Sequence, residues 1–384
     1  MNVAKLGKLI RPAKVQRAGS GSYPLLSMTM RHGLVPQSEK FKKRVAGADL
    51  SQYKVIDRNQ LVVGFPIDEA VLAFQRSIPA GIVSPAYGVW DLTDEAETDA
   101  LYLERFLRSP QAIAYYKAKL QGSTARRRSL PNSVFLDMDV PFPPPDEQRR
   151  IAAILDKADE LRTKRSQALA HLDTLTQSIF HSTFGSGVPA QSQHPVVKMG
   201  DVLVSATYGS SERAAISGDI PILRMGNLTY GGDLDFTDLK YLGANQPDKH
   251  LLRNGDVLFN RTNSADLVGK TAMFRGNGPA AYAGYLIRLR TSEDLLPEYL
   301  TTFMNLPSTK RLLRNMAKSI VGMANINAKE VQSIRLPLPP IELQQTFANR
   351  VAAVERLKAT HRKHLVELDA LFASLQHRAF KGEL

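Results

Sequence analysis

The sequence contains an internal repeat, and this duplication limits the folds that the chain can adopt. With an offset of 196 residues, residues 141–184 align without gaps on residues 337–380, with 13 identities. Both segments open on a proline-rich motif, VPFPPPDEQ at residues 140–148 and LPLPPIELQ at residues 336–344. A repeat of this length predicts that each half of the chain folds into an equivalent unit.

The sequences between these segments repeat more weakly. VAKLGKLI from Val3 resembles VVKMGDVL from Val196, and YLERFLRSP from Tyr102 resembles YLTTFMNLP from Tyr299. The weak matches have offsets between 193 and 197 residues, so they support one another as a set. We predict a first domain over residues 1–140, a helical spacer over 141–185, a linker over 186–195, a second domain over 196–336 and a second helical spacer over 337–384.

A long amphipathic helix is expected after each proline-rich motif. Acidic residues in the first turn, Asp146, Glu147 and Glu342, suit the positive end of a helix dipole. Apolar residues then recur in alternating steps of three and four, as in a coiled-coil seam. The predicted seam comprises Ile151, Ile154, Leu161, Leu172, Leu175 and Ile179, and Phe347, Val354, Leu357, Leu368, Leu371 and Leu375.

Polar residues interrupt this seam, namely Arg165 in the first helix and Arg350, His361 and His364 in the second. Two helices with matched length and seam are expected to pair antiparallel, because each can cover the apolar stripe of the other. The alternative is that each helix packs alone on its own domain.

The two domains are expected to be mixed α/β. Short runs such as VIDRNQLVV, GIVSPAYGVW and AAYAGYLIRLR are typical of strands, whereas residues 102–120 and 298–317 are typical of helices. A length of 384 residues is enough for two domains that each bury a core. The predicted fold is therefore α/β (mixed α+β), with two domains joined by an antiparallel pair of long helices.

The formal net charge of +13 indicates a polyanionic partner, of which nucleic acid is the commonest. Residues 1–140 carry 20 basic and 13 acidic side chains, and residues 196–336 carry 17 and 13, so the excess lies in the two domains. The absence of cysteine excludes disulfides and thiolate catalysis. With no apolar run of about 18 residues and no signal peptide, we expect a cytoplasmic protein without membrane contact.

No catalytic or metal-binding motif is recognisable, so the sequence predicts binding rather than catalysis, without a cofactor or metal of its own. Loops of both domains hold side chains that can donate to phosphates and base edges. In the first domain the candidates are Arg126, Arg127 and Arg128. In the second domain they are Tyr208, Ser210, Ser211, Arg213, Arg224, Asn227, Asn260, Arg261, Thr262, Asn263, Lys270, Asn325 and Asn327.

The duplicated proline-rich motifs and their helices, with IPILRMGNL and LLRNGDVLFNRTNSADLVGK in the second half and GIVSPAYGVW in the first, resemble the specificity subunit of type I restriction-modification enzymes. The resemblance implies two target-recognition domains, each reading one half of a bipartite double-stranded DNA target, with the helices fixing the gap between the halves. It also implies that two methyltransferase subunits dock on the chain and that restriction subunits join the full complex. S-adenosylmethionine, ATP and magnesium would then bind to those partners.

Two other functions stay open at this point. One is a fused methyltransferase or nuclease with an unrecognised motif, and the other is a coiled-coil scaffold that binds nucleic acid without sequence preference. The second proline-rich motif has Leu343 where the first has Glu147. This difference leaves open whether the two helices dock partners equally.

Overall fold

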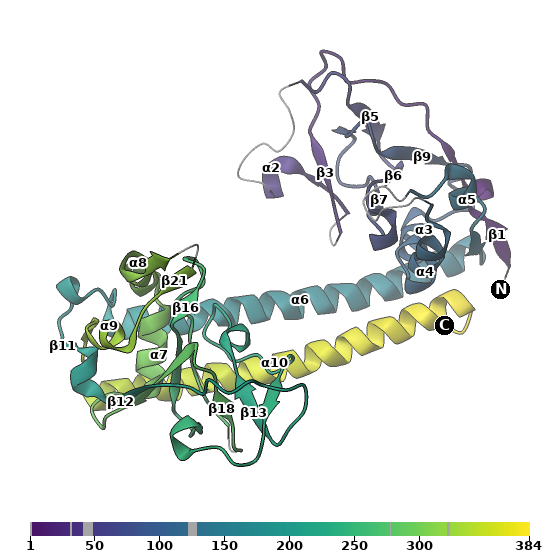
Figure 1. Cartoon of the computed structure of the whole chain (residues 1–384). Helices are drawn as coiled ribbons and strands as arrows, with labels where there is room; N and C mark the ends of the chain where they lie inside the picture. The colour runs from purple at the N-terminus through teal and green to yellow at the C-terminus, as the bar shows by residue number, and fades with distance from the viewer. Residues whose placement is uncertain (1, 31–32, 41–48, 122–128, 277, 321–322) are drawn as a thin grey trace. The chain divides into compact units, whose positions relative to one another are not determined.

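The structure is a computed structural model that describes residues 2–30, 33–40, 49–121, 129–276, 278–320 and 323–384. It divides into two units: unit 1 comprises Met1–Lys164 and Leu365–Leu384, and unit 2 comprises Arg165–His364. Each unit therefore combines one domain with part of both long helices (Figure 1). The linear order of domain and spacer does not reveal this interleaving.

Unit 1 is built from short strands with a few helices, and the long helix α6 begins in it. Its elements are β1 (Val3–Lys5), α1 (Leu6–Leu9), β2 (Ile10–Pro12), β3 (Leu26–Thr29), β4 (Gly33–Pro36), α2 (Gln37–Lys40), β5 (Lys54–Asp57), β6 (Leu61–Val63), η1 (Ile67–Glu69), β7 (Leu72–Phe74), β8 (Ala80–Val83), β9 (Gly88–Leu92), α3 (Ala100–Leu107), α4 (Pro110–Lys119), α5 (Asn132–Leu136), β10 (Asp139–Pro141) and α6 (Pro145–Phe184).

Unit 2 is also built from short strands with a few helices, and the long helix α10 begins in it. Its elements are η3 (Pro189–Gln191), β11 (Val196–Lys198), η4 (Met199–Val202), β12 (Leu203–Tyr208), β13 (Ile220–Leu223), η5 (Met225–Asn227), β14 (Lys240–Leu242), η6 (Asp248–His250), β15 (Val257–Asn260), β16 (Thr262–Asn263), β17 (Thr271–Met273), β18 (Ala281–Tyr282), β19 (Leu286–Thr291), α7 (Pro297–Asn305), α8 (Pro307–Met316), β20 (Lys318–Ile320), β21 (Met323–Asn325), α9 (Ala328–Gln332), β22 (Arg335–Pro337) and α10 (Ile341–Lys381).

Each unit contains an antiparallel four-stranded sheet, in the order β2-β9-β6-β7 in unit 1 and β12-β19-β15-β17 in unit 2. A helix pair packs beside it, α3 with α4 in unit 1 and α7 with α8 in unit 2. Ser109 starts α4 by accepting the N–H of Ala112 at 3.2 Å, and Pro110 follows at the first helical position. The predicted mixed α/β fold is confirmed.

The start of each domain pairs with the strand that leads into the long helix. β1 pairs with β10, with Val3 opposite Pro141, and β11 pairs with β22, with Val196 opposite Pro337. Both pairs are antiparallel, and their partners are related by the sequence repeat. A proline-rich segment therefore leaves a short sheet and enters a helix in each half of the chain.

A buried glutamine in the first turns of each long helix fixes this junction. The side chain of Gln148 donates to the carbonyls of Pro143 and Glu97 and accepts the N–H of Asp99, at 2.8 to 2.9 Å. Its repeat equivalent makes three hydrogen bonds of the same kind: Gln344 donates to Pro339 and Asp294 and accepts the N–H of Leu296. Both glutamines are 0% exposed.

The far end of each long helix completes the core of the unit that it reaches. In unit 1, Phe380 of α10 lies edge-on to Tyr102 and Phe106 of α3, with ring centroids 5.8 and 5.2 Å apart. In unit 2, Phe184 of α6 lies edge-on to Tyr299 of α7 at 4.9 Å. Phe184 and Phe380 are repeat equivalents, so each unit receives the same aromatic side chain from the helix that began in the other unit.

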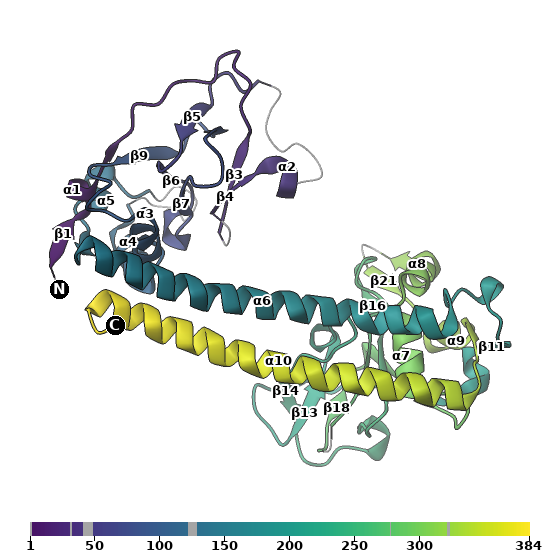
Figure 2. The ribbon, with the colours of Figure 1, turned by 180° about the vertical axis from the view of Figure 1, so that it is seen from behind.

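Within each unit α6 and α10 run antiparallel, as Figures 1 and 2 both show. In unit 1, Arg162 pairs with Asp369 at 2.6 Å and lies over the ring of Phe372. In unit 2, Lys358 pairs with Asp173 at 2.9 Å. These two ion pairs are repeat equivalents, because Lys358 aligns with Arg162 and Asp369 with Asp173.

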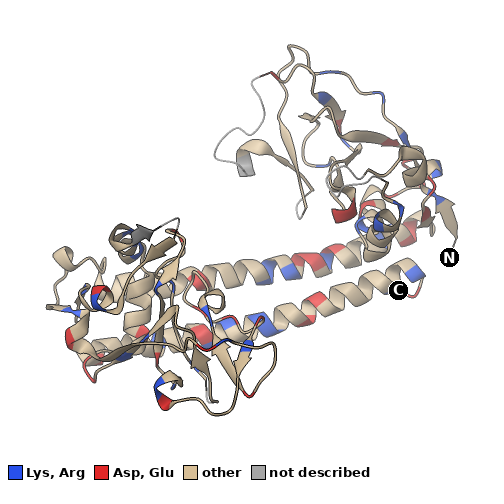
Figure 3. Ribbon diagram, viewed as in Figure 1, with Lys and Arg blue, Asp and Glu red and all other residues tan. Residues whose placement is uncertain are grey.

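Arg165 and His361 are also repeat equivalents, and they contact each other: Nη1 of Arg165 lies 3.2 Å from Nδ1 of His361. Charged residues of both signs are interspersed along the two helices (Figure 3). The antiparallel helix pair predicted from the repeat is thus present in each unit.

Four leucines of the predicted seam do not lie in it. Leu161, Leu175, Leu357 and Leu371 are 42%, 38%, 51% and 48% exposed, and those four assignments are wrong. The predicted positions seven residues apart that include Ile151 and Phe347 do lie in the seam. Between them, the residues that face the partner helix are each one position later in the sequence than predicted, as with Leu155, Arg162 and Lys358. The aliphatic stems of these basic residues cover apolar surface while their charged ends pair, so a seam position need not be apolar.

The other seam predictions agree with the burial of these residues. Ile151, Phe347 and Val354 are buried. The remaining members are half-buried, namely Ile154, Leu172, Ile179, Leu368 and Leu375.

Candidate nucleic-acid interface

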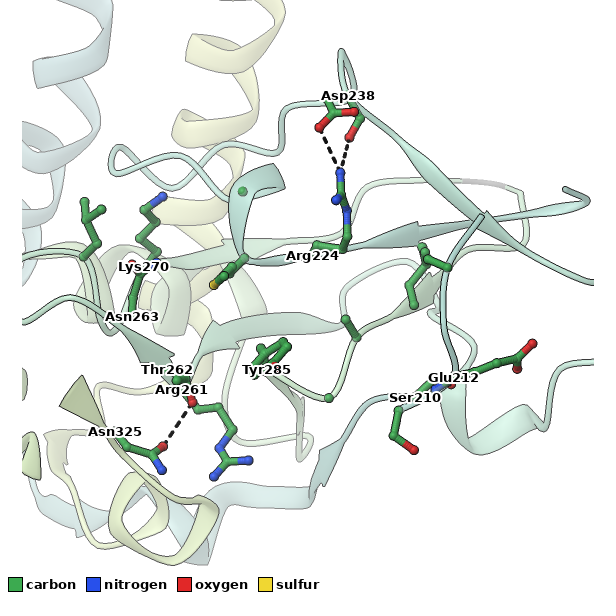
Figure 4. A pocket seen from close by; sticks show the side chains of 18 residues that line it. Ser210, Glu212, Arg224, Asp238, Arg261, Thr262, Asn263, Lys270, Tyr285 and Asn325 are labelled. Carbon is green, nitrogen blue, oxygen red and sulfur yellow. Dashed lines mark hydrogen bonds and ion pairs between the residues drawn. The ribbon is translucent and has the colours of Figure 1, made fainter. Parts of the chain in front are cut away.

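A cleft of about 1050 Å³ opens in unit 2 where several strands end (Figure 4). Its walls come from the loop after β12, from β13 and η5, from β16, from the β18–β19 turn and from β21. Eight of the predicted contact residues line it: Ser210, Ser211, Arg224, Arg261, Thr262, Asn263, Lys270 and Asn325. Loops up to 115 residues apart in the sequence thus present their polar side chains to one space.

Arg261 enters the cleft between two fixed residues. Asn260 is fully buried at the end of β15, and Thr262 is buried in β16, where its hydroxyl donates to Oδ1 of Asn325 at 3.2 Å. The guanidinium carbon of Arg261 lies 4.8 Å from the ring centroid of Tyr208. Tyr208 was predicted to contact DNA, but it does not line the cleft. It instead supports Arg261, whose guanidinium stacks on its ring.

Arg224 lines the same cleft, but its guanidinium is already engaged. Nη2 of Arg224 donates to the carbonyl oxygen and to a carboxylate oxygen of Asp238, both at 3.0 Å (Figure 4). Asn227 is buried beside it, where its Oδ1 accepts the N–H of Arg224 and its Nδ2 donates to the carbonyls of Asp235 and Asp238. Asn227 therefore shapes the loop and is not placed to touch DNA, contrary to the prediction.

Three further candidates lie outside the cleft lining. Asn260 is buried, so the prediction that it contacts DNA is not supported by its position. Asn327 caps α9, where its Oδ1 accepts the N–H of Glu330 at 3.0 Å. Arg213 is exposed in the loop that follows the cleft residues Ser210 and Ser211.

A second lysine lies close to the cleft residue Lys270. Lys310 of α8 donates to the carbonyl of Gly269 at 2.7 Å and lies over the ring of Tyr230. Burial, together with the positive charge of Lys270, lowers the pKa of Lys310 to about 7. Lys310 therefore does not line the cleft but holds the loop before β17 that carries Lys270.

The cleft also contains apolar surface that sequence reasoning missed. Tyr285, Met225 and Leu267 line it, and they are 55%, 36% and 38% exposed. The carbonyl of Tyr285 accepts the N–H of Arg261 at 3.1 Å, so this residue also fixes the position of Arg261. The glycine-rich turn around AYAGY was the available signal, because it placed an aromatic residue at a turn between two strands.

The predicted contacts of the first domain, Arg126, Arg127 and Arg128, lie outside the described residues. Within the described ranges, no group of three or more His, Asp or Glu side chains is arranged to hold a metal ion. In the same ranges, none of the helices has the length and apolar character needed to cross a membrane.

Residues 193–370 match the protein family described as the type I restriction modification DNA specificity domain. The chain is similar to the type I restriction enzyme EcoKI specificity subunit of Escherichia coli, at 28% identity over 269 residues. It is also similar to the putative type I restriction enzyme MjaX specificity subunit of Methanocaldococcus jannaschii, at 28% identity over 165 residues. These matches cover 64% and 42% of this chain and span only 58% and 39% of the two relatives.

Solved structures share the fold over nearly the whole chain. One is the S subunit of a type I restriction-modification system from M. genitalium, with a TM-score of 0.59 and 14% identity, covering 99% of this chain and 96% of that one. Another comes from work on complex assembly and conformational transition of the type I R-M system, with a TM-score of 0.56 and 18% identity, covering 100% and 98%. At these identities the likeness establishes the architecture of two domains and two long helices.

Proposed function

We propose that this chain is a specificity subunit of a type I restriction-modification system, as its similarities indicate, and that each of its two domains binds one half of a divided double-stranded DNA target. The observation that carries this proposal is the cleft of unit 2. It gathers basic, hydroxyl and amide side chains from separate loops beside exposed apolar ones. That mixture suits DNA, since cations bind phosphates, amides and guanidinium groups bind base edges, and apolar groups contact thymine methyl groups.

The test is to compare the binding of the full chain to its selected target and to scrambled duplexes at equal salt. Specific binders discriminate by about 10³-fold or more, and we expect a ratio of that order. A ratio near one would refute sequence recognition and would favour a scaffold that binds nucleic acid without preference.

Deleting one heptad from both helices is expected to shorten the preferred gap between the half-sites and to leave both half-sites unchanged.

We further propose that the two long helices dock two methyltransferase subunits, with restriction subunits joining the full complex. Support comes from the four leucines displaced from the seam, which form two repeat-equivalent sets: Leu161 with Leu357, and Leu175 with Leu371. Exposed leucines at matched positions of both helices provide the same apolar contact twice. Two identical partners would recognise such a doubled surface.

Serine substitutions at these leucines test the docking proposal. Leu161→Ser with Leu357→Ser is expected to abolish retention of co-expressed methyltransferase subunits on the tagged chain. Val366→Ser is the matched control, because Val366 is 68% exposed but its repeat equivalent is Ala170. Equal retention by the leucine variant and the control would contradict the proposal.

The chain is proposed to recognise DNA without catalysing a reaction. S-adenosylmethionine, ATP and magnesium then belong to the methyltransferase and restriction subunits. A methyl-transfer assay with the isolated chain, target DNA and S-adenosylmethionine decides between this proposal and a fused enzyme. We expect transfer only when the methyltransferase subunits are added.

A further inference from the structure

Three cationic side chains line the cleft of unit 2, and they differ in what already engages them. Arg224 is bound by Asp238 through its Nη2 group. The side chains of Arg261 and Lys270 make no hydrogen bond or ion pair with any residue that the structure describes. In Figure 4 dashed contacts reach the guanidinium of Arg224, and none reaches that of Arg261. Two cations of the cleft therefore remain for a ligand.

The position of Arg261 is fixed by its surroundings. Its N–H donates to the carbonyl of Tyr285 at 3.1 Å, and its carbonyl accepts the N–H of Ile326 at 2.9 Å. Its guanidinium stacks on Tyr208, whose hydroxyl accepts the N–H of Ala328 at 2.9 Å. A guanidinium held by stacking and by a pinned backbone loses less conformational freedom on binding than a free one.

The hydrogen-bond donors of Arg261 that are accessible to a ligand match the acceptors of one base. Its Nε is buried without a hydrogen-bond partner among the described residues, so the two terminal Nη groups are the donors available to a ligand. Two parallel N–H groups match the O6 and N7 acceptors of guanine, which lie side by side in the major groove. No other base presents two acceptors in that arrangement.

We propose that Arg261 is a specificity-determining residue that reads a guanine in the half-site bound by unit 2. This inference rests on the proposed function, since it names one base of the target. Lys270 is assigned a different role, because a lysine is a flexible point charge without the rigid paired donors of a guanidinium. It binds a phosphate and adds affinity without sequence preference.

Selection of bound sequences tests the two roles. The full chain and its Arg261→Lys variant each select from duplexes with randomised bases at one salt concentration. The variant keeps the charge and loses the paired donors, so we expect its preference for one guanine to fall by about 10- to 100-fold while the rest of the motif persists. Lys270→Gln is the matched control and is expected to weaken all duplexes alike and to lower the salt slope by about 1.

A modified base provides a second readout that is independent of the selection. Placing 7-deazaguanine at the selected position removes N7 and leaves base pairing intact. We expect the original chain to bind this duplex about 10-fold more weakly, and the Arg261→Lys variant to bind the two duplexes equally. Unchanged melting of the variant shows that it is folded.

Three results would overturn the inference. The first is a variant that keeps the guanine preference. The second is a variant that weakens all duplexes alike, as a phosphate contact would. The third is an equal loss with 7-deazaguanine in both proteins, since another residue would then read that base. A chain that selects no motif at all would instead refute DNA recognition, so the two failures are distinguishable.

Discussion

In unit 1 a basic residue of the domain meets acidic residues of the helix, whereas in unit 2 the signs are reversed. Arg105 of α3 donates to Asp156 and Asp159 of α6 at 2.9 and 3.0 Å. In unit 2, Asp233 of the loop after η5 pairs with Lys358 and Arg362 of α10. The position equivalent to Arg105 holds Thr302, whose hydroxyl donates to the carbonyl of Glu298 within α7.

The uncharged contacts of the two junctions are nevertheless the same. Both contain the buried glutamine with three hydrogen bonds, and both contain a buried tyrosine whose hydroxyl donates to the last proline of the short sheet, Tyr102 to Pro141 and Tyr299 to Pro337, at 2.8 Å. The comparison shows that the buried contacts are what the two junctions have in common. The ionic contacts around them can then differ in sign and in the elements that supply them.

The largest effect is expected from the shared part of the junction. Gln148→Leu and Gln344→Leu each leave one backbone N–H and two carbonyls without partners, which should cost each unit about 3 kcal/mol. Hydrogen exchange of peptides from each unit measures the two losses separately. Clearly unequal losses, or an effect in the opposite unit, would break the equivalence of the two junctions.

A smaller effect is expected from the ionic contacts, and it should differ between the units. Lys358 is 5% exposed and meets Asp173, Asp233 and Glu355, so Lys358→Met should destabilise unit 2 by about 2 kcal/mol. Arg105 is more exposed and its partners are hydrated, so Arg105→Met should cost unit 1 about 1 kcal/mol.

Denaturation at low and high salt checks this pair of predictions. Salt screens exposed charges more than buried ones, so the loss in Arg105→Met should shrink with salt more than the loss in Lys358→Met. The same salt dependence in both variants would mean that the two ionic contacts are equally exposed.

A pH-dependent difference between the units is expected from Lys310, which occupies the position of Ile113 in unit 1. Burial lowers the pKa of Lys310 to about 7, so its neutral form is favoured in the folded state while the unfolded chain still binds the proton. The stability of unit 2 should therefore rise as the pH increases from about 7 toward 10.5, by at most about 1.4 kcal/mol per pH unit.

Lys310→Ile removes this titration and serves as the comparison. The difference in unfolding free energy between the original chain and the variant is expected to change across that pH range and to level off below pH 7. A difference that stays constant from pH 6 to 10 would show that Lys310 keeps its charge in the folded state.

The smallest effect is expected at the leucines outside the seam. Leu161→Ala and Leu357→Ala should each change stability by less than about 0.5 kcal/mol, because both side chains are largely exposed. Leu155→Ala is the control, since Leu155 is fully buried and its loss should cost about 3 kcal/mol. A large loss in either exposed variant would restore these leucines to the seam.

The sequence predicted the repeat, the mixed α/β domains and the antiparallel helices, because these depend on long patterns that occur twice. It misplaced four of the twelve seam residues, since periodicity alone favoured Leu161 and Leu357 over Arg162 and Lys358. In the structure Arg162 is half-buried and Lys358 is buried, and each pairs with an aspartate of the partner helix. A pattern of apolar residues does not reveal such paired charges.

The candidate site was predicted only in part. The residue types were sufficient to select Arg261 and Lys270, but they equally selected Asn227 and Asn260, which the fold buries. Whether a polar side chain faces a cleft or supports a loop depends on contacts between distant segments. The pairing of Arg224 with Asp238, 14 residues away, is one contact that loop composition did not indicate.

The exchange of helix ends also bears on the order in which the chain can fold during synthesis. Tyr102 and Phe106 leave the ribosome early, yet the aromatic ring that packs against them, Phe380, is made some 270 residues later. Phe184, which packs against Tyr299 of the second domain, is translated before the residues of that domain. The domain that is made first is thus the one whose core is completed last, and until then the apolar surface that Phe380 covers stays exposed to other chains.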